Sequence, residues 1–225
     1  MSHKRVIDCD HALFQSLVDI VADTVNQSSH TNLSARKSDG DADTMIVTTA
    51  VELASSGENV LILADDSDIL FLCLAQSNTE NLFLKQIGQI YDIDKTKKSM
   101  PAEIAEYILV LHGLFGCDTT SGFYQRHSIF STKWASVTEH LRFFVKNDSS
   151  KEEIEAAGQA LIAHRYNYEL PLNTARKKLY NSKCTTAKKN MNLASLPPIE
   201  DAVKLHSLRA YHQIQEWLPG ILYHL

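Results

Sequence analysis

The residues best suited to chemistry in this sequence are aspartates, which gather in three short polar stretches, GDADT, ADDSD and GCDTT. These stretches supply six carboxylates, namely Asp41, Asp43, Asp65, Asp66, Asp68 and Asp118. Clustered carboxylates repel one another, so a nearby cation is their natural compensation. Oxygen ligands without His or Cys favour Mg²⁺ or Mn²⁺ over zinc. Two such ions can activate water and stabilise the leaving oxygen of a phosphodiester, so the pattern predicts metal-dependent hydrolysis of a polyanion.

The charge distribution along the chain agrees with this interpretation. Nine acidic residues and no Lys or Arg lie in residues 38–84, whereas six basic residues and no acid lie in residues 170–199. The basic segment includes Arg176, Lys177 and Lys178, which are candidates for phosphate contacts, with a solvated helix face as the structural alternative. Because the overall net charge is −5, any contact with nucleic acid has to come from such a local surface.

Each acidic stretch also has a purely structural interpretation. Asp43 could cap a helix, and the stretch from Asp65 to Asp68 could be a capped turn. Asp118 could be an Asx-turn residue that bonds its own backbone. Three independent caps, however, would not need to be unopposed by basic charge. We therefore expect a shared pocket in which four acids bind metal and carry the catalysis: Asp43, Asp66, Asp68 and Asp118.

Apolar spacing predicts strands and helices in the first half of the chain. Helices are expected over residues 11–25 and from Asp41 or Asp43 to Gly57. The continuous apolar run 59–64 predicts a strand in the middle of a covered, parallel sheet. The next apolar segment, 68–77, is ambiguous between a helix and a strand. Asp66 and Asp68 directly follow the predicted strand, and sites in open α/β sheets form outside such carboxyl ends.

The remainder of the chain shows mainly helical patterns. Two short strands are expected around Gly88, and a helix is expected to start near Ser99 and Pro101 and to continue through LVLHGL. Further helices are predicted over 134–146, 151–164, 172–182 and 200–218. The fold class is therefore α/β, with a helical region after the sheet.

The composition excludes several classes of protein. The four cysteines are scattered without a C-x-x-C pair, which indicates reduced thiols instead of zinc ligands or a disulfide framework. No signal-peptide core is present, and no run approaches the roughly 18 apolar residues of a membrane span. We expect an intracellular protein of the nucleus or cytoplasm.

Other catalytic patterns are missing from the sequence. It contains no G-x-S-x-G elbow, no Walker loop and no G-x-G-x-x-G. The ten histidines lack zinc spacing and are expected to have structural or surface roles. His112, just before the third acidic stretch, is expected to finish a helix, where a cation suits the dipole; a place near the site is the alternative.

Three segments, GDADTMIVTTA, VLILADDSDILFLCLA and LHGLFGCDTTSGF, resemble the PIN/flap-endonuclease-like nuclease superfamily. The closer resemblance is to a group of transposable-element-derived animal proteins with a G-C-D-T-T-S motif, whose tail segment is similar to NLASLPPIEDAVKLHSLRAYHQIQEWL. The resemblance covers residues 35–125 and 150–218. It implies a PIN-like, mainly parallel sheet flanked by helices in residues 1–125, and a helical extension over 126–225.

The resemblance also implies roles for individual residues. The first acidic pair of the family corresponds to Asp41 and Asp43, and the acids after the strand correspond to Asp66 and Asp68. The acid of the G-C-D turn corresponds to Asp118. In such nucleases these acids bind Mg²⁺ or Mn²⁺ and cleave DNA or RNA. The superfamily begins with a strand that ends in an aspartate; RVIDCD could imitate it, but the chain more readily begins inside the domain and lacks that strand.

Three functions compete on this basis. The leading hypothesis is a metal-dependent nuclease. The alternative from another class is a catalytically inactive relative that binds nucleic acid or protein, and the lack of the first strand favours it. A phosphatase of the haloacid dehalogenase type, with Asp66 as nucleophile and Asp68 as acid, ranks last because Leu70 stands where that motif requires Thr.

Overall fold

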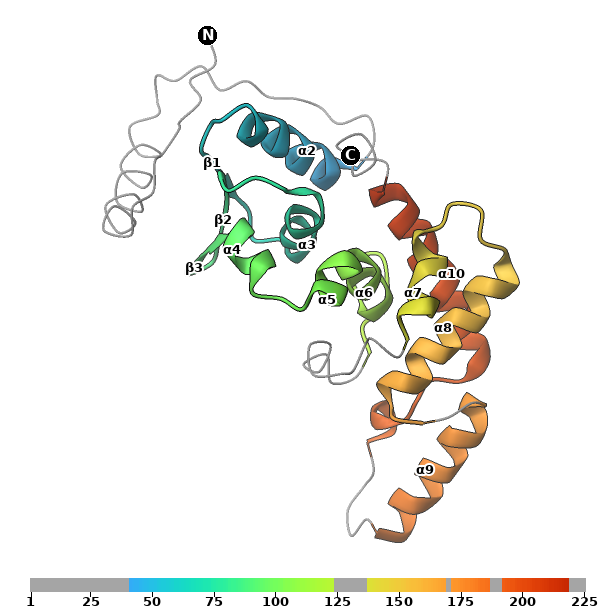
Figure 1. Cartoon of the computed structure of the whole chain (residues 1–225). Helices are drawn as coiled ribbons and strands as arrows, with labels where there is room; N and C mark the ends of the chain where they lie inside the picture. The colour runs from blue at the N-terminus through green and yellow to red at the C-terminus, as the bar shows by residue number, and fades with distance from the viewer. Residues whose placement is uncertain (1–40, 124–136, 169–170, 187–191, 219–225) are drawn as a thin grey trace.

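The computed structural model describes residues 41–123, 137–168, 171–186 and 192–218 (Figure 1). The expected helix over 11–25 and the candidate opening strand RVIDCD lie outside these ranges. Within them, the chain forms a small three-stranded sheet with helices before, between and after its strands.

Local signals account for the first three elements. Helix α2 (Ala42–Ser55) starts at the side chain of Asp41, which accepts hydrogen bonds from the backbone N–H groups of Asp43 and Thr44. After α2 the chain turns through Gly57, whose φ of 92° suits glycine. Strand β1 (Val60–Leu63) follows, and the ambiguous segment after it is a helix, α3 (Ser67–Gln76), capped by Asp66.

The sheet is small and mixed, whereas a mainly parallel sheet was expected. Strand β1 pairs in parallel with β2 (Leu82–Gln86), and β2 pairs antiparallel with β3 (Gln89–Asp92). The two residues between β2 and β3, with Gly88 at φ 73°, can make only a hairpin, because a parallel connection needs a long crossover. The strand order β1-β2-β3 places β1 at an edge of the described sheet, although its apolar sequence predicted a central position.

The helix expected after Ser99 is divided into shorter pieces. Helix α4 (Ile93–Lys98) follows β3 directly, and α5 (Ala102–Glu106) begins after Pro101. Helix α6 (Ile108–Phe115) then starts at Tyr107, whose φ of −111° interrupts the helical path. All eight residues of α6 are buried, so this short helix runs through the centre of the core.

The second half of the described chain is helical, as predicted. It contains α7 (Thr138–Val145), α8 (Lys151–Arg165), α9 (Leu172–Thr186), the 3₁₀ turn η4 (Leu193–Ser195) and α10 (Glu200–Trp217). The expected capping box at the start of α8 is present, with Ser150 and Glu153 bonding each other's backbone N–H groups. None of the described helices is both long and apolar enough to cross a membrane.

Helix α10 connects the two halves of the molecule. It packs against α6, α7 and α8, and one hydrophobic core extends from α2 through α6 to Trp217 at the end of α10. Helix α9 lies at the opposite end of the molecule from α2 and the sheet (Figure 1). The start of α10 adjoins α9, since the backbone N–H of Asn173 donates to Glu200 at 3.1 Å.

The closest approach of α8 to α10 gives a test of this packing. A Cβ added at Gly158 would lie 1.8 Å from Ser207 Oγ and 2.6 Å from Ser207 Cβ. Alanine would gain up to about 1 kcal/mol in helix propensity, but overpacking costs about 1–3 kcal/mol. We therefore expect Gly158→Ala to lower the Tm by several degrees in thermal denaturation, and Ser207→Gly to recover most of the loss. A Gly158→Ala protein more stable than the parent would contradict this helix spacing.

Candidate metal centre

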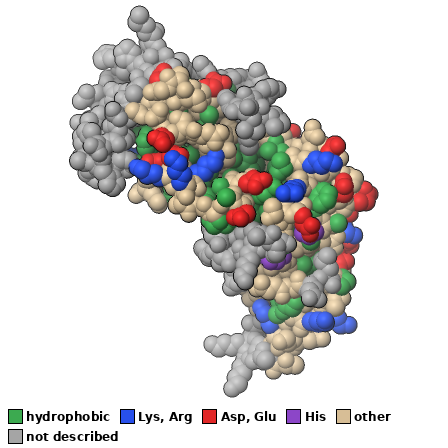
Figure 2. Space-filling view, in the orientation of Figure 1, with side chains coloured by type: hydrophobic (Ala, Val, Ile, Leu, Met, Phe, Trp, Pro, Cys, Tyr) green, Lys and Arg blue, Asp and Glu red, His purple; other side chains and the backbone are tan. Residues whose placement is uncertain are grey.

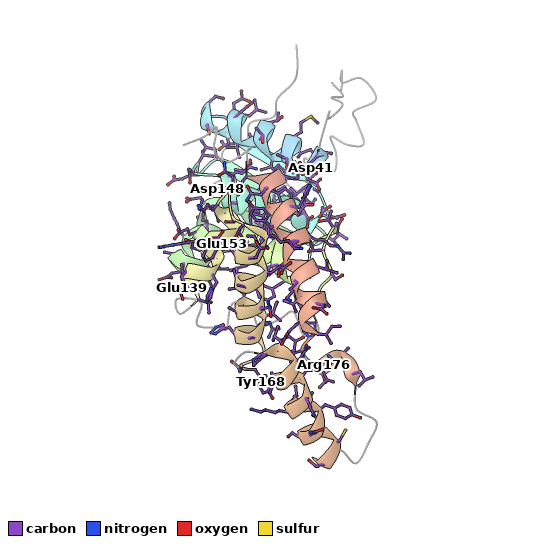
Figure 3. All side chains as sticks on the ribbon, turned by 90° about the vertical axis from the view of Figure 1, so that its right-hand side faces the viewer. Asp41, Glu139, Asp148, Glu153, Tyr168 and Arg176 are labelled. Atoms are coloured by element: carbon purple, nitrogen blue, oxygen red, sulfur yellow. The ribbon has the colours of Figure 1, made fainter. Side chains whose placement is uncertain are left out.

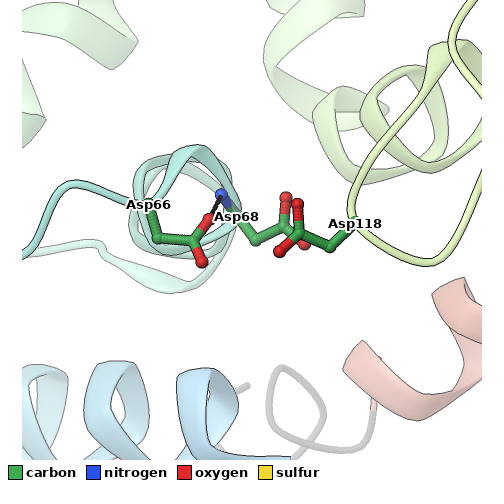
Figure 4. A group of neighbouring side chains, drawn as sticks. All are labelled: Asp66, Asp68 and Asp118. Carbon is green, nitrogen blue, oxygen red and sulfur yellow. Dashed lines mark hydrogen bonds between the residues drawn. The ribbon is translucent and has the colours of Figure 1, made fainter.

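Three of the predicted ligands meet in the structure. Asp66, Asp68 and Asp118 each offer a carboxylate oxygen, and the three oxygens lie within 4.8 Å of one another (Figure 4). Asp66 and Asp68 stand at the start of α3, directly after β1, whereas Asp118 stands on the turn after α6. The arrangement brings two predicted acidic stretches into one acidic triad of Asp66, Asp68 and Asp118.

Asp66 is at once a helix cap and a member of the triad. Its Oδ1 accepts a hydrogen bond of 2.8 Å from the backbone N–H of Asp68, as the structural interpretation expected. A carboxylate has a second oxygen with its own lone pairs, so capping leaves Asp66 free to bind a cation. The backbone carbonyl of Asp66 accepts a 2.6 Å hydrogen bond from the Gln86 side chain, which fixes the start of α3 to β2.

Asp68 is the buried member of the triad, with 5% of its surface exposed. His112 Nε2 donates a hydrogen bond of 2.7 Å to its Oδ1. The imidazole is stacked against Phe71 at 3.9 Å and against Trp217 at 5.8 Å between ring centroids. His112 therefore has a fixed orientation beside the site, which was only the alternative interpretation of its position in the sequence. Sequence reasoning missed this hydrogen bond because Asp68 lies 44 residues away from His112 and no local pattern marks the pair.

In the turn that carries Asp118, two segments of backbone approach each other closely. Gly116 has a φ of 121°, and a Cβ there would lie 2.5 Å from the Cα of Gly122, so only glycine fits. The Thr120 hydroxyl donates to the carbonyl of Gly113 at 2.7 Å and accepts from the backbone N–H of Cys117 at 3.1 Å. Asp118 itself is exposed, and its carboxylate makes no hydrogen bond within the described ranges, unlike an Asx-turn residue.

Asp43 belongs to the same electrostatic environment. Burial, followed by the charges of Asp41, Asp66, Asp68 and Asp118, raises the pKa of Asp43 to about 6. Asp43, the fourth predicted ligand, thus interacts electrostatically with all three members of the acidic triad. Asp41 serves as the cap of α2, and its Oδ2 also accepts a 2.6 Å hydrogen bond from the Thr44 hydroxyl.

The donors of this site fit a hard divalent cation. Among the residues that the structure describes, no Lys or Arg forms an ion pair with Asp43, Asp66 or Asp118. A set of carboxylate oxygens without thiolate or imidazole ligands is typical of sites for Mg²⁺, Mn²⁺ or Ca²⁺. The acidic triad could therefore bind a metal ion, and its geometry does not select one metal among these.

The predicted basic residues lie far from the triad. Figure 3 shows Asp41 and Arg176 towards opposite ends of the molecule, and Figure 2 shows basic side chains without acidic neighbours at the end formed by α9. Arg176 donates to the carbonyl of Pro197, and Lys183 donates to Ser195 Oγ at 2.6 Å. These two cations hold the segment before α10, whereas Lys177 and Lys178 are exposed to solvent.

Comparisons of this chain with protein families, with curated proteins and with solved structures gave no match. Any assignment to a nuclease superfamily therefore depends on the motifs and on the geometry of the acids.

The raised pKa of Asp43 predicts how stability depends on pH. The group is at the first turn of α2, where the helix dipole favours a negative charge, so burial and repulsion must outweigh that benefit. Because the folded pKa of about 6 exceeds the ordinary aspartate value of 3.8, the contribution of Asp43 to stability is fully present below pH 3.8 and is lost as the pH rises through about 6.

We therefore expect Asp43→Asn to have a higher Tm than the parent at pH 7 without metal, by a few degrees, and no advantage near pH 4. The measurement is thermal denaturation in chelator across this pH range. Glu52→Gln, an exposed carboxylate on the same helix, is the matched control and should show no such crossover. Parallel curves for Asp43→Asn and the parent would argue against a cluster around Asp43.

Proposed function

We propose that this protein is a metal-dependent phosphodiesterase that acts on DNA or RNA, a nuclease of the PIN/flap-endonuclease type. The observation that carries the proposal is the convergence of Asp66, Asp68 and Asp118, with Asp43 in electrostatic contact, and no described Lys or Arg paired with Asp43, Asp66 or Asp118. Acids from two distant parts of the sequence meet, and the charge of Asp43 from a third part adds to their repulsion. A divalent cation, Mg²⁺ or Mn²⁺, is the simplest partner for such a site.

The residues of the site would have different roles in the reaction. Asp66, Asp68 and Asp118 would hold the cation, and Asp43 stands beside them as a further ligand or as the acceptor of a proton from an attacking water. A bound divalent ion would lower the pKa of that water and stabilise the leaving oxygen. His112 keeps one oxygen of Asp68 occupied, so the carboxylate is held in a single orientation.

The position of α9 indicates how a nucleic acid would lie. Helix α10 has its first residues beside α9 and its last residue, Trp217, against His112. Its 18 residues span about 27 Å at 1.5 Å per residue. Because the basic residues of α9 and the acids lie at the two ends of α10, we infer that only a long substrate uses both surfaces.

A substitution at Asp66 tests the proposal most cleanly. Asparagine caps a helix about as well as aspartate, so Asp66→Asn keeps the start of α3 and removes only the charge. We expect the parent protein to cleave labelled single-stranded or flap substrates in the presence of Mn²⁺. Cleavage should stop when the Mn²⁺ is chelated. Cleavage by Asp66→Asn should fall by at least about 100-fold, the order seen when a charge-stabilising group is lost.

Asp65→Asn is the matched control, because Asp65 is exposed, adjacent in sequence and outside the triad. It should cleave at the parental rate. If the parent binds Mn²⁺ and nucleic acid but cleaves nothing, the protein is the inactive relative that acts as a binding module. If Asp66→Asn cleaves as well as the parent, the acidic triad is not the active site.

The basic surface of α9 gives a separate prediction. Each lost phosphate contact reduces the salt dependence of binding by about one unit of slope. We expect Lys177→Ala with Lys178→Ala to weaken binding of duplexes of about 20 base pairs and to reduce the salt dependence by up to about two units of slope, as measured by fluorescence anisotropy at several salt concentrations. Unchanged affinity and salt dependence would show that α9 does not contact the nucleic acid.

A further inference from the structure

The orientation of Asp118 depends on its turn, because its carboxylate has no hydrogen bond to the rest of the described chain. Two constraints on this turn are local. Gly116 packs against Gly122, and the Thr120 hydroxyl bonds the carbonyl of Gly113. The third constraint comes from elsewhere in the chain: the Thr119 hydroxyl donates to Gln213 Oε1 of α10 at 2.8 Å, across 94 residues of sequence. Thr119 is the immediate neighbour of Asp118, so this bond restrains the stretch of backbone that carries Asp118.

The same end of α10 also contacts the residues that hold Asp68. Trp217, four residues after Gln213 and so on the same face of the helix, stacks on His112, which bonds Asp68. Between them, Ile214 lies 3.1 Å from the position that a Cβ of Gly113 would occupy. One face of α10 therefore fixes two of the three members of the acidic triad, each through a single intermediate residue.

We propose that Gln213 and Thr119 are positioning residues of the metal site, through which α10 holds Asp118 in its ligand geometry. The proposal rests on metal binding by the acidic triad, as proposed above, but not on cleavage. Losing a partner bonded directly to a ligand typically weakens metal affinity by about 10- to 100-fold. The Thr119–Gln213 bond acts one residue away from the ligand, so its loss is expected to cost less. The Thr119–Gln213 bond is exposed, so its removal is not expected to unfold the protein.

The test is Mn²⁺ affinity, measured from the free-ion signal by electron paramagnetic resonance and without any nucleic acid. Thr119→Val has nearly the shape of Thr but no hydroxyl, and Gln213→Ala removes the acceptor while keeping a good helix former. We expect each to bind Mn²⁺ roughly 3- to 10-fold more weakly, with the metal-free Tm unchanged within a few degrees. Thr119→Val also removes the 3.2 Å contact of the Thr119 hydroxyl with Cys117 Sγ, so the double variant should be no weaker than Thr119→Val alone.

Two matched controls separate positioning from general packing. Thr119→Ser keeps the hydroxyl and should retain parental affinity, and His212→Ala changes an exposed residue of α10 next to Gln213 and should do the same. If the parent binds Mn²⁺ and Gln213→Ala binds it equally well, or if the two single effects add, the positioning role is wrong while the metal site stands. If the parent fails to bind Mn²⁺, the metal site itself is wrong and this inference falls with it.

Discussion

The mutual repulsion of four aspartates is the interaction that the rest of this fold has to accommodate. Asp43, Asp66 and Asp68 all lie at the first turns of α2 and α3 or cap them, where the helix dipole favours negative charge. At exposed sites, such a placement typically stabilises a negative charge by about 0.3–1 kcal/mol. The raised pKa of Asp43 shows that these benefits do not offset burial and the neighbouring charges. The acids stay together because the elements that carry them cannot move apart independently of the core.

That rigidity comes from α6 and from the end of α10. Every residue of α6 is buried, and its glycine at position 113 lets Ile214 and Trp217 approach closely. A packed interior responds to strain as a unit, so a shift that relieved the repulsion at Asp68 would have to disturb the stack of Phe71, His112 and Trp217. The helical second half of the chain is therefore part of the same core that positions the acids, although the sequence resemblance treats it as an extension.

What the sequence could predict was local. The cap at Asp66, the hairpin at Gly88 and the capping box at Ser150 each depend on a few adjacent residues, and the acidic stretches were recognised by their places at the ends of elements. The pairings between distant residues left no local pattern. The hydrogen bond of His112 to Asp68, that of Thr119 to Gln213 and the use of Arg176 to hold Pro197 are of this kind. The place of β1 at an edge of the described sheet also left no local pattern, since an apolar run does not by itself say which strands pair with it.

Structural roles account for some of the acids but not for all of them. Capping gives a structural role to Asp41 and to one oxygen of Asp66, and the hydrogen bond from His112 gives one to an oxygen of Asp68. Asp118 and Asp43 have no such role. A turn shaped by Gly116 and Gly122 presents Asp118 to the other acids. Asp43 is held where its charge is unfavourable at neutral pH, and the charge of Asp118 contributes to this effect. A bound cation would offset the repulsion between these two acids, which no described contact explains.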